Sequence, residues 1–372
     1  MHPLLQPIDL RGLRCPNRVF MAPLTRQRAA RPEGVVGELQ AEHYAQRASF
    51  GLLISEATQI SAEGKGYPRT PGIHDPAHVA GWKLVTDRVH AAGGRIFLQL
   101  WHVGRVSHPH HQPGGQAPVS CVAKASIAQI SILHPDGRRE MVPAGMPRAL
   151  ETHEMPRVVS DYAHAAANAK AAGFDGVEVH GANSYLINQF LSGSLNTRTD
   201  AWGGSIGNRL RLLLEATDAA AKAFGHARVG VRLSPMGSVK DLPIAPDDRD
   251  LMLRAAQELG DRGCAYLHLY SHHFGTAGWD GPFDRALAEG MKANFRGPVV
   301  LNGYARDVDA AVRDVRDGLG DAIAFGKLAI SNPDLPERLR DGAALAEWND
   351  QLFYGDGPAG YNDYPRAVAA AV

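Results

Sequence analysis

The run PRVVSDYAHAAANAKAAGFDGVEVHGANSYL, residues 156–186, contains the two kinds of element whose alternation decides the fold. Four apolar side chains share one face of its first part, residues 156–172: Val159, Tyr162, Ala166 and Ala169. This spacing predicts an amphipathic helix, and Gly173 is typical of the residue that follows a helix C-terminus. The apolar run GVEVH at 176–180 predicts a buried strand directly afterwards.

Short strand-like runs, each followed by a helix-like stretch, recur along the whole chain. The eight candidate strands are residues 18–23, 51–57, 95–101, 176–180, 229–233, 265–269, 298–302 and 322–325. Alternation of this kind predicts a parallel sheet, and eight such units predict an α/β fold of the (β/α)8 TIM barrel type. No linker or change of composition marks a second domain, so we expect residues 1–372 to form one domain.

The chain of 372 residues exceeds the roughly 250 residues of a usual barrel, so it must carry insertions. The longest candidate follows strand three, at about 103–152, and we expect it to form a lid. HPDGR at 134–138 is a turn signal between two β-rich runs, which predicts a β-hairpin inside this lid. We expect an N-terminal hairpin, with its turn near Leu10, Arg11 and Gly12, to close the bottom of the barrel.

Composition and charge exclude several classes of protein. With 44% hydrophobic and 21% charged residues, the chain is typical of a globular protein. The 39 Lys and Arg residues balance the 39 Asp and Glu residues, so no overall charge favours nucleic acid or an anionic membrane. No apolar run has the length of a membrane span, and the first residues do not resemble a signal peptide. We therefore expect a cytoplasmic protein whose partners are small molecules.

Neither the cysteines nor the histidines indicate a metal centre. Cys15, Cys121 and Cys264 lie far apart in the chain, so we expect reduced, structural thiols. The histidines at 102, 108, 110 and 111 lack the spacing of a zinc site. Arg232 and Lys327, which we expect at strand ends, would repel a metal ion. A metal-dependent barrel hydrolase is therefore disfavoured.

The most informative polar segment is HGANSYL at 180–186, directly after the fourth strand. Barrel enzymes carry their catalytic residues at the carboxyl ends of strands. His180 and Asn183 could donate hydrogen bonds to one substrate oxygen, as in an oxyanion hole, and Tyr185 would be protonated at neutral pH and suited to giving a proton. The alternative is that all three satisfy buried loop backbone, and the residues alone leave both interpretations open.

The last two strands carry weaker signals for an anion site. Gly303 and Gly326 would let backbone N–H groups approach a phosphate, and Lys327 would supply charge. Lone glycines after strands are also ordinary turn residues. Arg232, at the end of strand five, needs an anionic or carbonyl partner inside the barrel. That partner is either a ligand or an internal salt bridge.

Several motifs, in order and along almost the whole chain, carry a resemblance to a known family. They are APLTR at 22–26, SEATQIS at 55–61, GYPRTPGI at 66–73, LQLWHVGR at 98–105, AGFDGVEVHGANSYLINQFL at 172–191, GVRLSP at 230–235, FGKLAISNPDLPERL at 325–339 and FYGDGPAGYNDYP at 353–365. Together they resemble the Old Yellow Enzyme family of flavin-dependent ene-reductases. No single motif of the set would suffice.

The resemblance implies one non-covalent FMN in the mouth of a single barrel domain. The implied contacts are the flavin ring with Pro23, Leu24, Thr25, Ala57 and Gln99, flavin N1 and O2 with Arg232, and the phosphate with Asn302, Gly303, Gly326 and Lys327. A fixed guanidinium beside N1 makes chemical sense, because the reduced flavin is anionic there. Where many relatives carry arginine in the phosphate loop this chain has Lys327, which cannot make a bidentate contact.

The resemblance also implies a ping-pong reaction with NADPH or NADH as reductant and an activated alkene as substrate, such as an enone, enal, maleimide or nitroalkene. Flavin N5 gives hydride to the β-carbon and Tyr185 protonates the α-carbon, while His180 and Asn183 hold the activating group. Aromatic residues are expected to wall the substrate side: Tyr67, Trp101, Phe353 and Tyr354. We expect a monomer or homodimer.

Two other functions remain as alternatives. Another FMN barrel, such as a hydroxy-acid oxidase, would need a histidine base that takes a proton from its substrate, and Tyr185 beside His180 and Asn183 argues against it. A barrel that only binds flavin or small aromatic molecules would show no turnover. Bleaching of a yellow protein by NADPH and its recovery with an enone would separate these cases.

Overall fold

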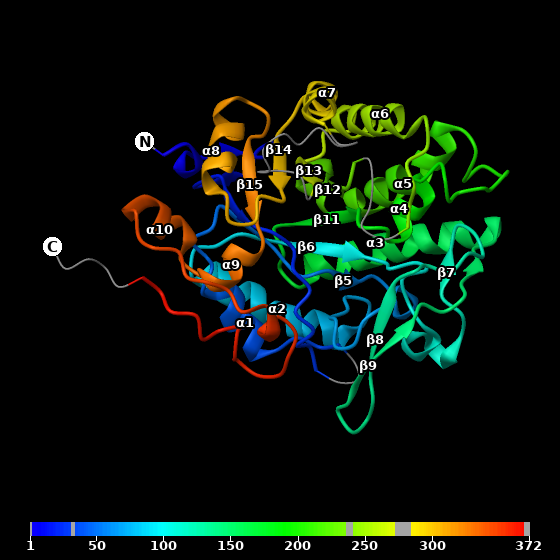
Figure 1. Cartoon of the computed structure of the whole chain (residues 1–372), viewed down its shortest axis with the longest axis horizontal. Coiled ribbons are helices and arrows are strands. Elements are labelled where there is room, and N and C mark those ends of the chain that lie inside the picture. Colours follow the sequence, from blue (N-terminus) through cyan, green and yellow to red (C-terminus); the bar gives the residue numbers. More distant parts are fainter. Residues whose placement is uncertain (1, 31–33, 236–240, 272–283, 368–372) are drawn as a thin grey trace.

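Eight parallel strands form a closed barrel in the computed structural model, which describes residues 2–30, 34–235, 241–271 and 284–367 (Figure 1). In barrel order the strands are β3 (Val19–Met21), β4 (Leu52–Ile54), β6 (Ile96–Trp101), β11 (Gly176–Gly181), β12 (Val229–Leu233), β13 (Tyr266–Tyr270), β14 (Val299–Asn302) and β15 (Ala322–Phe325). Pairing of β6 with β11 and of β15 with β3 closes the ring. The predicted fold class is confirmed, and each predicted strand forms.

Helices surround the barrel because the residues between strands bury one face and expose the other (Figure 1). They are α1 (Glu38–Ala45), α2 (Pro76–Ala91), α3 (Met155–Ala171), α4 (Leu186–Leu191), α5 (Ile206–Phe224), α6 (Asp248–Asp261), α7 (Arg285–Phe295), α8 (Val308–Arg316), α9 (Lys327–Ser331) and α10 (Leu335–Asp341). Helix α3 begins one residue before the predicted start, and Val158 rather than Val159 is fully buried. Gly173 follows it with a φ of 88°.

The predicted N-terminal hairpin closes one end of the barrel. Strands β1 (Ile8–Asp9) and β2 (Arg14–Cys15) pair antiparallel around a turn in which Arg11 and Gly12 have positive φ. The hairpin's buried apolar residues pack in one cluster with Phe20, Phe97 and Tyr266 from inside the barrel. Each fully buried aromatic ring contributes about 1.5–3 kcal/mol through the hydrophobic effect, so this end is a packed core. A ligand must therefore enter from the opposite end.

The long insertion after β6 contains the predicted hairpin. Strands β8 (Gln129–Leu133) and β9 (Arg139–Pro143) pair antiparallel and project from the barrel (Figure 1), and the short strands β7 (Val119–Ser120) and β10 (Arg148–Ala149) pair beside them. Ile130 on β8 packs in a cluster with Tyr67 and Tyr185. Arg139 on β9 donates to Gln27 Oε1 after β3, at 2.6 Å. The hairpin therefore contacts residues that follow three barrel strands, β3, β4 and β11.

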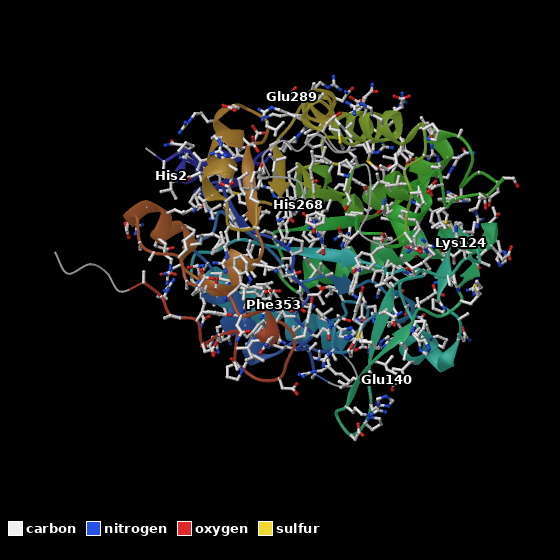
Figure 2. The ribbon with its side chains drawn as sticks, viewed as in Figure 1. His2, Lys124, Glu140, His268, Glu289 and Phe353 are labelled. Carbon is white, nitrogen blue, oxygen red and sulfur yellow. The ribbon has the colours of Figure 1, made fainter. Side chains whose placement is uncertain are left out.

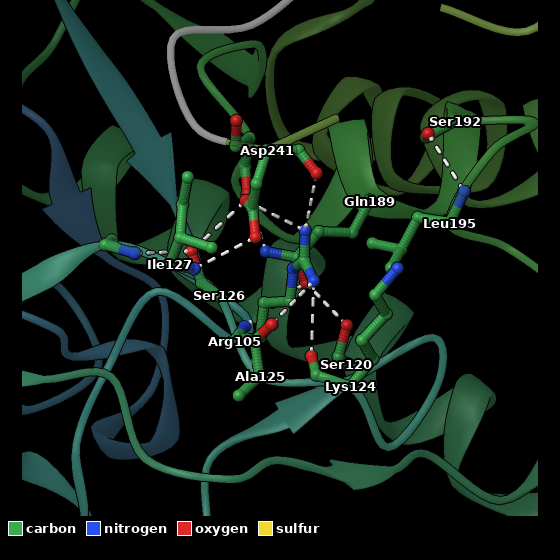
Figure 3. Close-up of polar contacts among 12 residues, drawn as sticks. Arg105, Ser120, Lys124, Ala125, Ser126, Ile127, Gln189, Ser192, Leu195 and Asp241 are labelled. Atoms are coloured by element: carbon green, nitrogen blue, oxygen red, sulfur yellow. Dashed lines mark hydrogen bonds and ion pairs between the residues drawn. The ribbon is translucent and has the colours of Figure 1, made fainter. Parts of the chain in front are cut away.

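A buried arginine anchors the base of this insertion (Figure 3). Arg105, which is fully buried, donates to the carbonyls of Lys124 and Ala125 at 3.2 and 3.1 Å and to Asp241 Oδ1 at 3.0 Å. Asp241 Oδ2 in turn accepts from the Ile127 N–H at 2.9 Å. These bonds tie residues 124–127 to the barrel, so the hairpin has a fixed origin.

Among the described residues, no helix is both long and apolar enough to cross a membrane. The thiols of Cys15, Cys121 and Cys264 are buried and unpaired. In the same part of the chain, no three histidine, cysteine or acidic side chains lie close enough together to hold a metal ion.

Candidate active site

A cavity of about 670 Å³ opens at the carboxyl ends of the barrel strands. It lies within the usual volume range of about 300–1,000 Å³ for ligand sites. Twelve of the predicted site residues line it: Pro23, Leu24, Thr25, Tyr67, Asn183, Tyr185, Arg232, Asn302, Gly303, Gly326, Lys327 and Tyr354. Residues from β3 to the C-terminal segment, far apart in the sequence, therefore line the same cavity.

The remaining predicted residues lie around this cavity but are not among those that line it: Ala57, Gln99, Trp101, His180 and Phe353. Trp101 is fully buried, stacks on Tyr67 with ring centroids 5.7 Å apart, and meets the Tyr185 ring edge-on at 5.1 Å. It therefore supports two lining residues from behind. Phe353 lies on the C-terminal segment, below His268 in the view of Figure 2, and its ring is near Arg26 and Lys327.

The loop after β11 is held in an uncommon conformation. Asn183 and Ser184 both have left-handed φ, 58° and 64°, and each such non-glycine residue costs on the order of 1–3 kcal/mol. Two residues of α4 fix the loop: Asn188 Oδ1 accepts from the Ser184 N–H at 2.9 Å, and Gln189 Nε2 donates to the Ser184 carbonyl at 2.7 Å. The sequence motif at 172–191 does not by itself reveal that Asn188 and Gln189 fix this loop.

His180 is neutral and its tautomer follows from one hydrogen bond. The Ala182 N–H donates to His180 Nδ1 at 3.3 Å, so Nδ1 is the acceptor and the ring proton resides on Nε2. Burial lowers the pKa of His180 well below its usual value, and the positive charge of Arg232 lowers it further. Nε2–H is therefore a neutral donor. The ring lies beside Tyr185, with centroids 5.1 Å apart.

Ser234, at the end of β12, orients the Asn183 side chain. The Ser234 hydroxyl donates to Asn183 Oδ1 at 3.0 Å and accepts from the Asn183 backbone N–H at 3.0 Å. Because the amide oxygen is engaged, the Nδ2 group is the donor that remains. Sequence analysis missed Ser234, although its place in the GVRLSP motif at a strand end could have indicated it.

Tyr185 is a protonated phenol at neutral pH. Burial raises the pKa of Tyr185 well above its usual value. Its hydroxyl lies 3.2 Å from the Tyr67 hydroxyl, and either one can donate. Once Tyr185 has released its proton, its oxygen can only accept, so Tyr67 must then be the donor.

Arg232 is a buried cation whose Nε donor has no partner. Nη2 donates to Asn302 Oδ1 at 2.7 Å, and the guanidinium lies over the Tyr270 ring, 4.8 Å from its centroid. Nε is buried without a hydrogen-bond partner, and within the described ranges no carboxylate lies within 4 Å of this side chain. The internal salt bridge considered as an alternative is therefore not seen there. Both ends of the Asn302 amide have a partner, since its Nδ2 donates to the Ala324 carbonyl at 2.7 Å.

A buried carboxylate inside the barrel, Glu178, balances this cation. Its oxygens accept from Gln99 Nε2 at 2.8 Å, Tyr266 Oη at 3.0 Å and His268 Nδ1 at 2.8 Å. Burial acts to raise the pKa of Glu178, but the His268 and Arg232 charges and these donors outweigh it and lower the pKa. We missed this residue, although a lone acid within the apolar run GVEVH, in step with His180, was a signal for it.

The residues predicted to form an anion site, Gly303, Gly326 and Lys327, line this same cavity. Gly303 has a φ of 146°, and a Cβ on Gly326 would lie 3.4 Å from Leu24. Lys327 Nζ contacts Asp350 Oδ1 at 3.0 Å, and both side chains are about half exposed. Exposed pairs of this kind contribute only about 0–1 kcal/mol, so an anionic ligand can replace Asp350.

Comparison with known proteins gives consistent matches over nearly the whole chain. Residues 3–346 match the NADH:flavin oxidoreductase / NADH oxidase family. The 12-oxophytodienoate reductase 7 of Oryza sativa subsp. japonica is 42% identical, over 98% of this chain and 94% of that protein. A probable flavin mononucleotide-dependent alkene reductase of Leishmania infantum is 40% identical, over 97% of both chains.

Solved structures give the same result. Morphinone reductase in complex with tetrahydroNAD superimposes with a TM-score of 0.92 at 48% identity, over 98% of both chains. The Old Yellow Enzyme homologue from Zymomonas mobilis superimposes with a TM-score of 0.89 at 40% identity, over 97% of this chain and 99% of that one.

Proposed function

Because the chain belongs to the NADH:flavin oxidoreductase / NADH oxidase family, that of the Old Yellow Enzymes, we propose that its cavity reduces activated alkenes such as enones, enals, maleimides and nitroalkenes. It is an FMN-dependent oxidoreductase that uses NAD(P)H and acts on carbon–carbon double bonds. Three polar groups support the assignment of the substrate end: His180 Nε2–H at the end of β11, and Asn183 Nδ2 and Tyr185 Oη in the loop that follows it.

The residues present fit FMN. Arg232 Nε is a buried donor without a partner, on a side chain that lines the cavity, and an electron-rich ring edge would satisfy it. Pro23, Leu24 and Thr25 would hold the ring, and Gly303 with Gly326 would leave room for the phosphate. Gln99 does not line the cavity, and its Nε2 donates a hydrogen bond to Glu178. When bound, FMN takes a hydride from NAD(P)H and gives a hydride to the β-carbon of the alkene.

The end of β11 and the loop after it supply the donors for the substrate oxygen. His180 and Asn183 would each donate a hydrogen bond to the carbonyl or nitro oxygen, where negative charge develops during reduction. Such a donor typically contributes about 3 kcal/mol in the transition state. Both donors are preorganised, His180 by its bond from Ala182 and Asn183 by Ser234.

Tyr185 would transfer its Oη proton to the α-carbon. The charge left on the phenol oxygen needs a donor, and the Tyr67 hydroxyl at 3.2 Å is placed to supply it. The insertion at about 103–152 would act as the predicted lid, since Val106, Ala128 and Ile130 pack against both tyrosines and exclude water there. Three expectations stay predictions from the sequence. They are that residues 1–372 form one domain, that the protein is cytoplasmic, and that it is a monomer or homodimer.

The test is anaerobic spectroscopy of the purified protein loaded with FMN. NADPH or NADH should bleach the yellow colour, and cyclohexenone should restore it. Tyr185→Phe should leave the bleaching nearly unchanged and slow the recovery by roughly two to four orders of magnitude, the range for a general acid. Bleaching by a 2-hydroxy acid instead of NAD(P)H would indicate an oxidase, and absence of both reactions would indicate a binding protein.

A further inference from the structure

The C-terminal segment 353–361 has no α-helix or strand of its own, yet it contributes Tyr354 to the cavity wall. Tyr354 is 53% exposed, so it stands at the rim of the cavity. In Figure 1 this red segment passes beside α1, and His43 Nδ1 of that helix lies 3.0 Å from the Tyr361 carbonyl. Segments without helix or strand owe their position to side-chain contacts. The contacts that hold residues 353–361 thus decide where Tyr354 lies.

Among the described residues, Arg28 donates more hydrogen bonds to this segment and its flank than any other side chain does. Its guanidinium donates to four carbonyls around the segment, those of Leu352, Phe353, Gly357 and Ala359, at 3.0, 2.9, 3.2 and 2.9 Å. The fifth donor bonds the Arg26 carbonyl at 3.2 Å. All five N–H groups are therefore used, on a side chain that is 3% exposed.

The neighbouring Arg26 also binds this segment. Nε donates to the Phe353 carbonyl at 3.1 Å and Nη2 to the Gly360 carbonyl at 2.7 Å. Both guanidinium groups lie over the Tyr361 ring, 4.9 Å from its centroid for Arg26 and 4.7 Å for Arg28. Within the described ranges, neither arginine has a carboxylate within the 4.0 Å of an ion pair.

Burying a guanidinium costs free energy, and a buried cation usually recovers this cost through a carboxylate partner. Here backbone dipoles and one aromatic face take that place. Burial lowers the pKa of Arg28 to about 10, which still leaves it charged at neutral pH. Arg28 follows the cavity residues Leu24 and Thr25 by only a few positions. The loop after β3 therefore lines the cavity and also binds the segment that contains Tyr354 at the cavity rim.

We propose that Arg28 is a positioning residue that determines substrate specificity: by binding carbonyls on both sides of Tyr354 it sets the width of the cavity rim. Alkenes whose substituents reach the rim depend on this width, whereas small cyclic enones do not. This inference rests on the proposed alkene reduction.

The experiment compares Arg28→Met, Tyr354→Ala and the double variant. Met preserves most of the volume of the arginine stem and removes all five donors. The measured values are KM and kcat for cyclohexenone and for chalcone, an enone with two phenyl rings. Arg340→Met is the matched control, because Arg340 is exposed and pairs only with the adjacent Asp341 among described residues.

In Arg28→Met we expect the ratio of kcat/KM for chalcone to that for cyclohexenone to change at least about fivefold, mostly through KM. The cyclohexenone kcat should stay within about twofold of the parent value. The same substitution should leave the ratio unchanged in the Tyr354→Ala background, since it acts through Tyr354. An equal change in both backgrounds, or no change in the ratio, overturns the proposal.

Hydrogen exchange of residues 352–361 gives a readout that needs no turnover. Arg28→Met should speed amide exchange in this segment, and Arg340→Met should not. If Arg28→Met does not fold, Asp356→Asn takes its place, because Asp356 pairs with Arg69 and its side chain is 74% exposed. Faster exchange without a change in substrate ratio refutes the specificity role. If the unmodified protein reduces no activated alkene, the proposed function is refuted instead.

Discussion

The hydrogen bond between Tyr67 and Tyr185 is open to a direct test by Tyr67→Phe. The substitution removes the hydroxyl that lies 3.2 Å from Tyr185 Oη and keeps the ring that stacks on Trp101. A hydrogen bond to a charged group contributes about 1.5–3 kcal/mol. Since each 1.36 kcal/mol is a factor of ten in rate, proton transfer from Tyr185 should slow about 10- to 150-fold.

Stopped-flow spectroscopy measures this effect in the recovery of flavin colour with cyclohexenone. The bleaching by NAD(P)H is the internal control and should change less than about twofold, because Tyr185 gives no proton in that half of the cycle.

A double-mutant cycle separates this role from simple packing. If Tyr67 acts through Tyr185, then Tyr67→Phe has no further effect in a Tyr185→Phe protein. Equal slowing in both backgrounds would show that Tyr67 serves only as a wall of the cavity, and the hydrogen-bond argument would be refuted.

Three further outcomes follow from the site. Ser234→Ala frees the amide of Asn183 to rotate and should lower kcat/KM for enones about 5- to 30-fold in steady-state assays, with the flavin content unchanged. Arg232→Met should weaken binding of FMN to the apoprotein at least about tenfold, as measured by quenching of flavin fluorescence; unaltered affinity would remove Arg232 from the cofactor site. Burial raises the pKa of Glu56 from 4.5 to about 7, so the folded protein holds this proton more tightly than the unfolded chain does. The free energy of unfolding should therefore fall as the pH rises from 4.5 to 7, and urea titrations should show a flatter profile for Glu56→Gln.

Local patterns were enough to predict the barrel. The eight strands are short apolar runs and the helices between them have period 3.6, so neighbouring residues carry the signal. The run 229–233 matches β12 and the run 322–325 matches β15 residue for residue. The segment after β11 was likewise singled out from its own residues, because donors that follow a barrel strand lie at its carboxyl end. Those residues alone left open whether they bind a substrate or the loop backbone.

The partners of these residues could not be predicted in the same way. Glu178 lies between two valines in the sequence, and only closure of the barrel brings Gln99, Tyr266 and His268 to its two oxygens. Lys327 pairs with Asp350, and no local pattern indicates this contact. Each of these contacts joins side chains from different elements.

The amino-acid sequence by itself determined the strands, the helices and the end of the barrel at which the polar loop lies, because these depend on the periodicity of adjacent residues. Only the tertiary structure decided which way the Asn183 amide points and that Arg28 binds a segment some 325 positions away. Hydrogen bonds have a range of about 3 Å and a required direction. Chain closure sets such distances and directions, and no local pattern of residues encodes them.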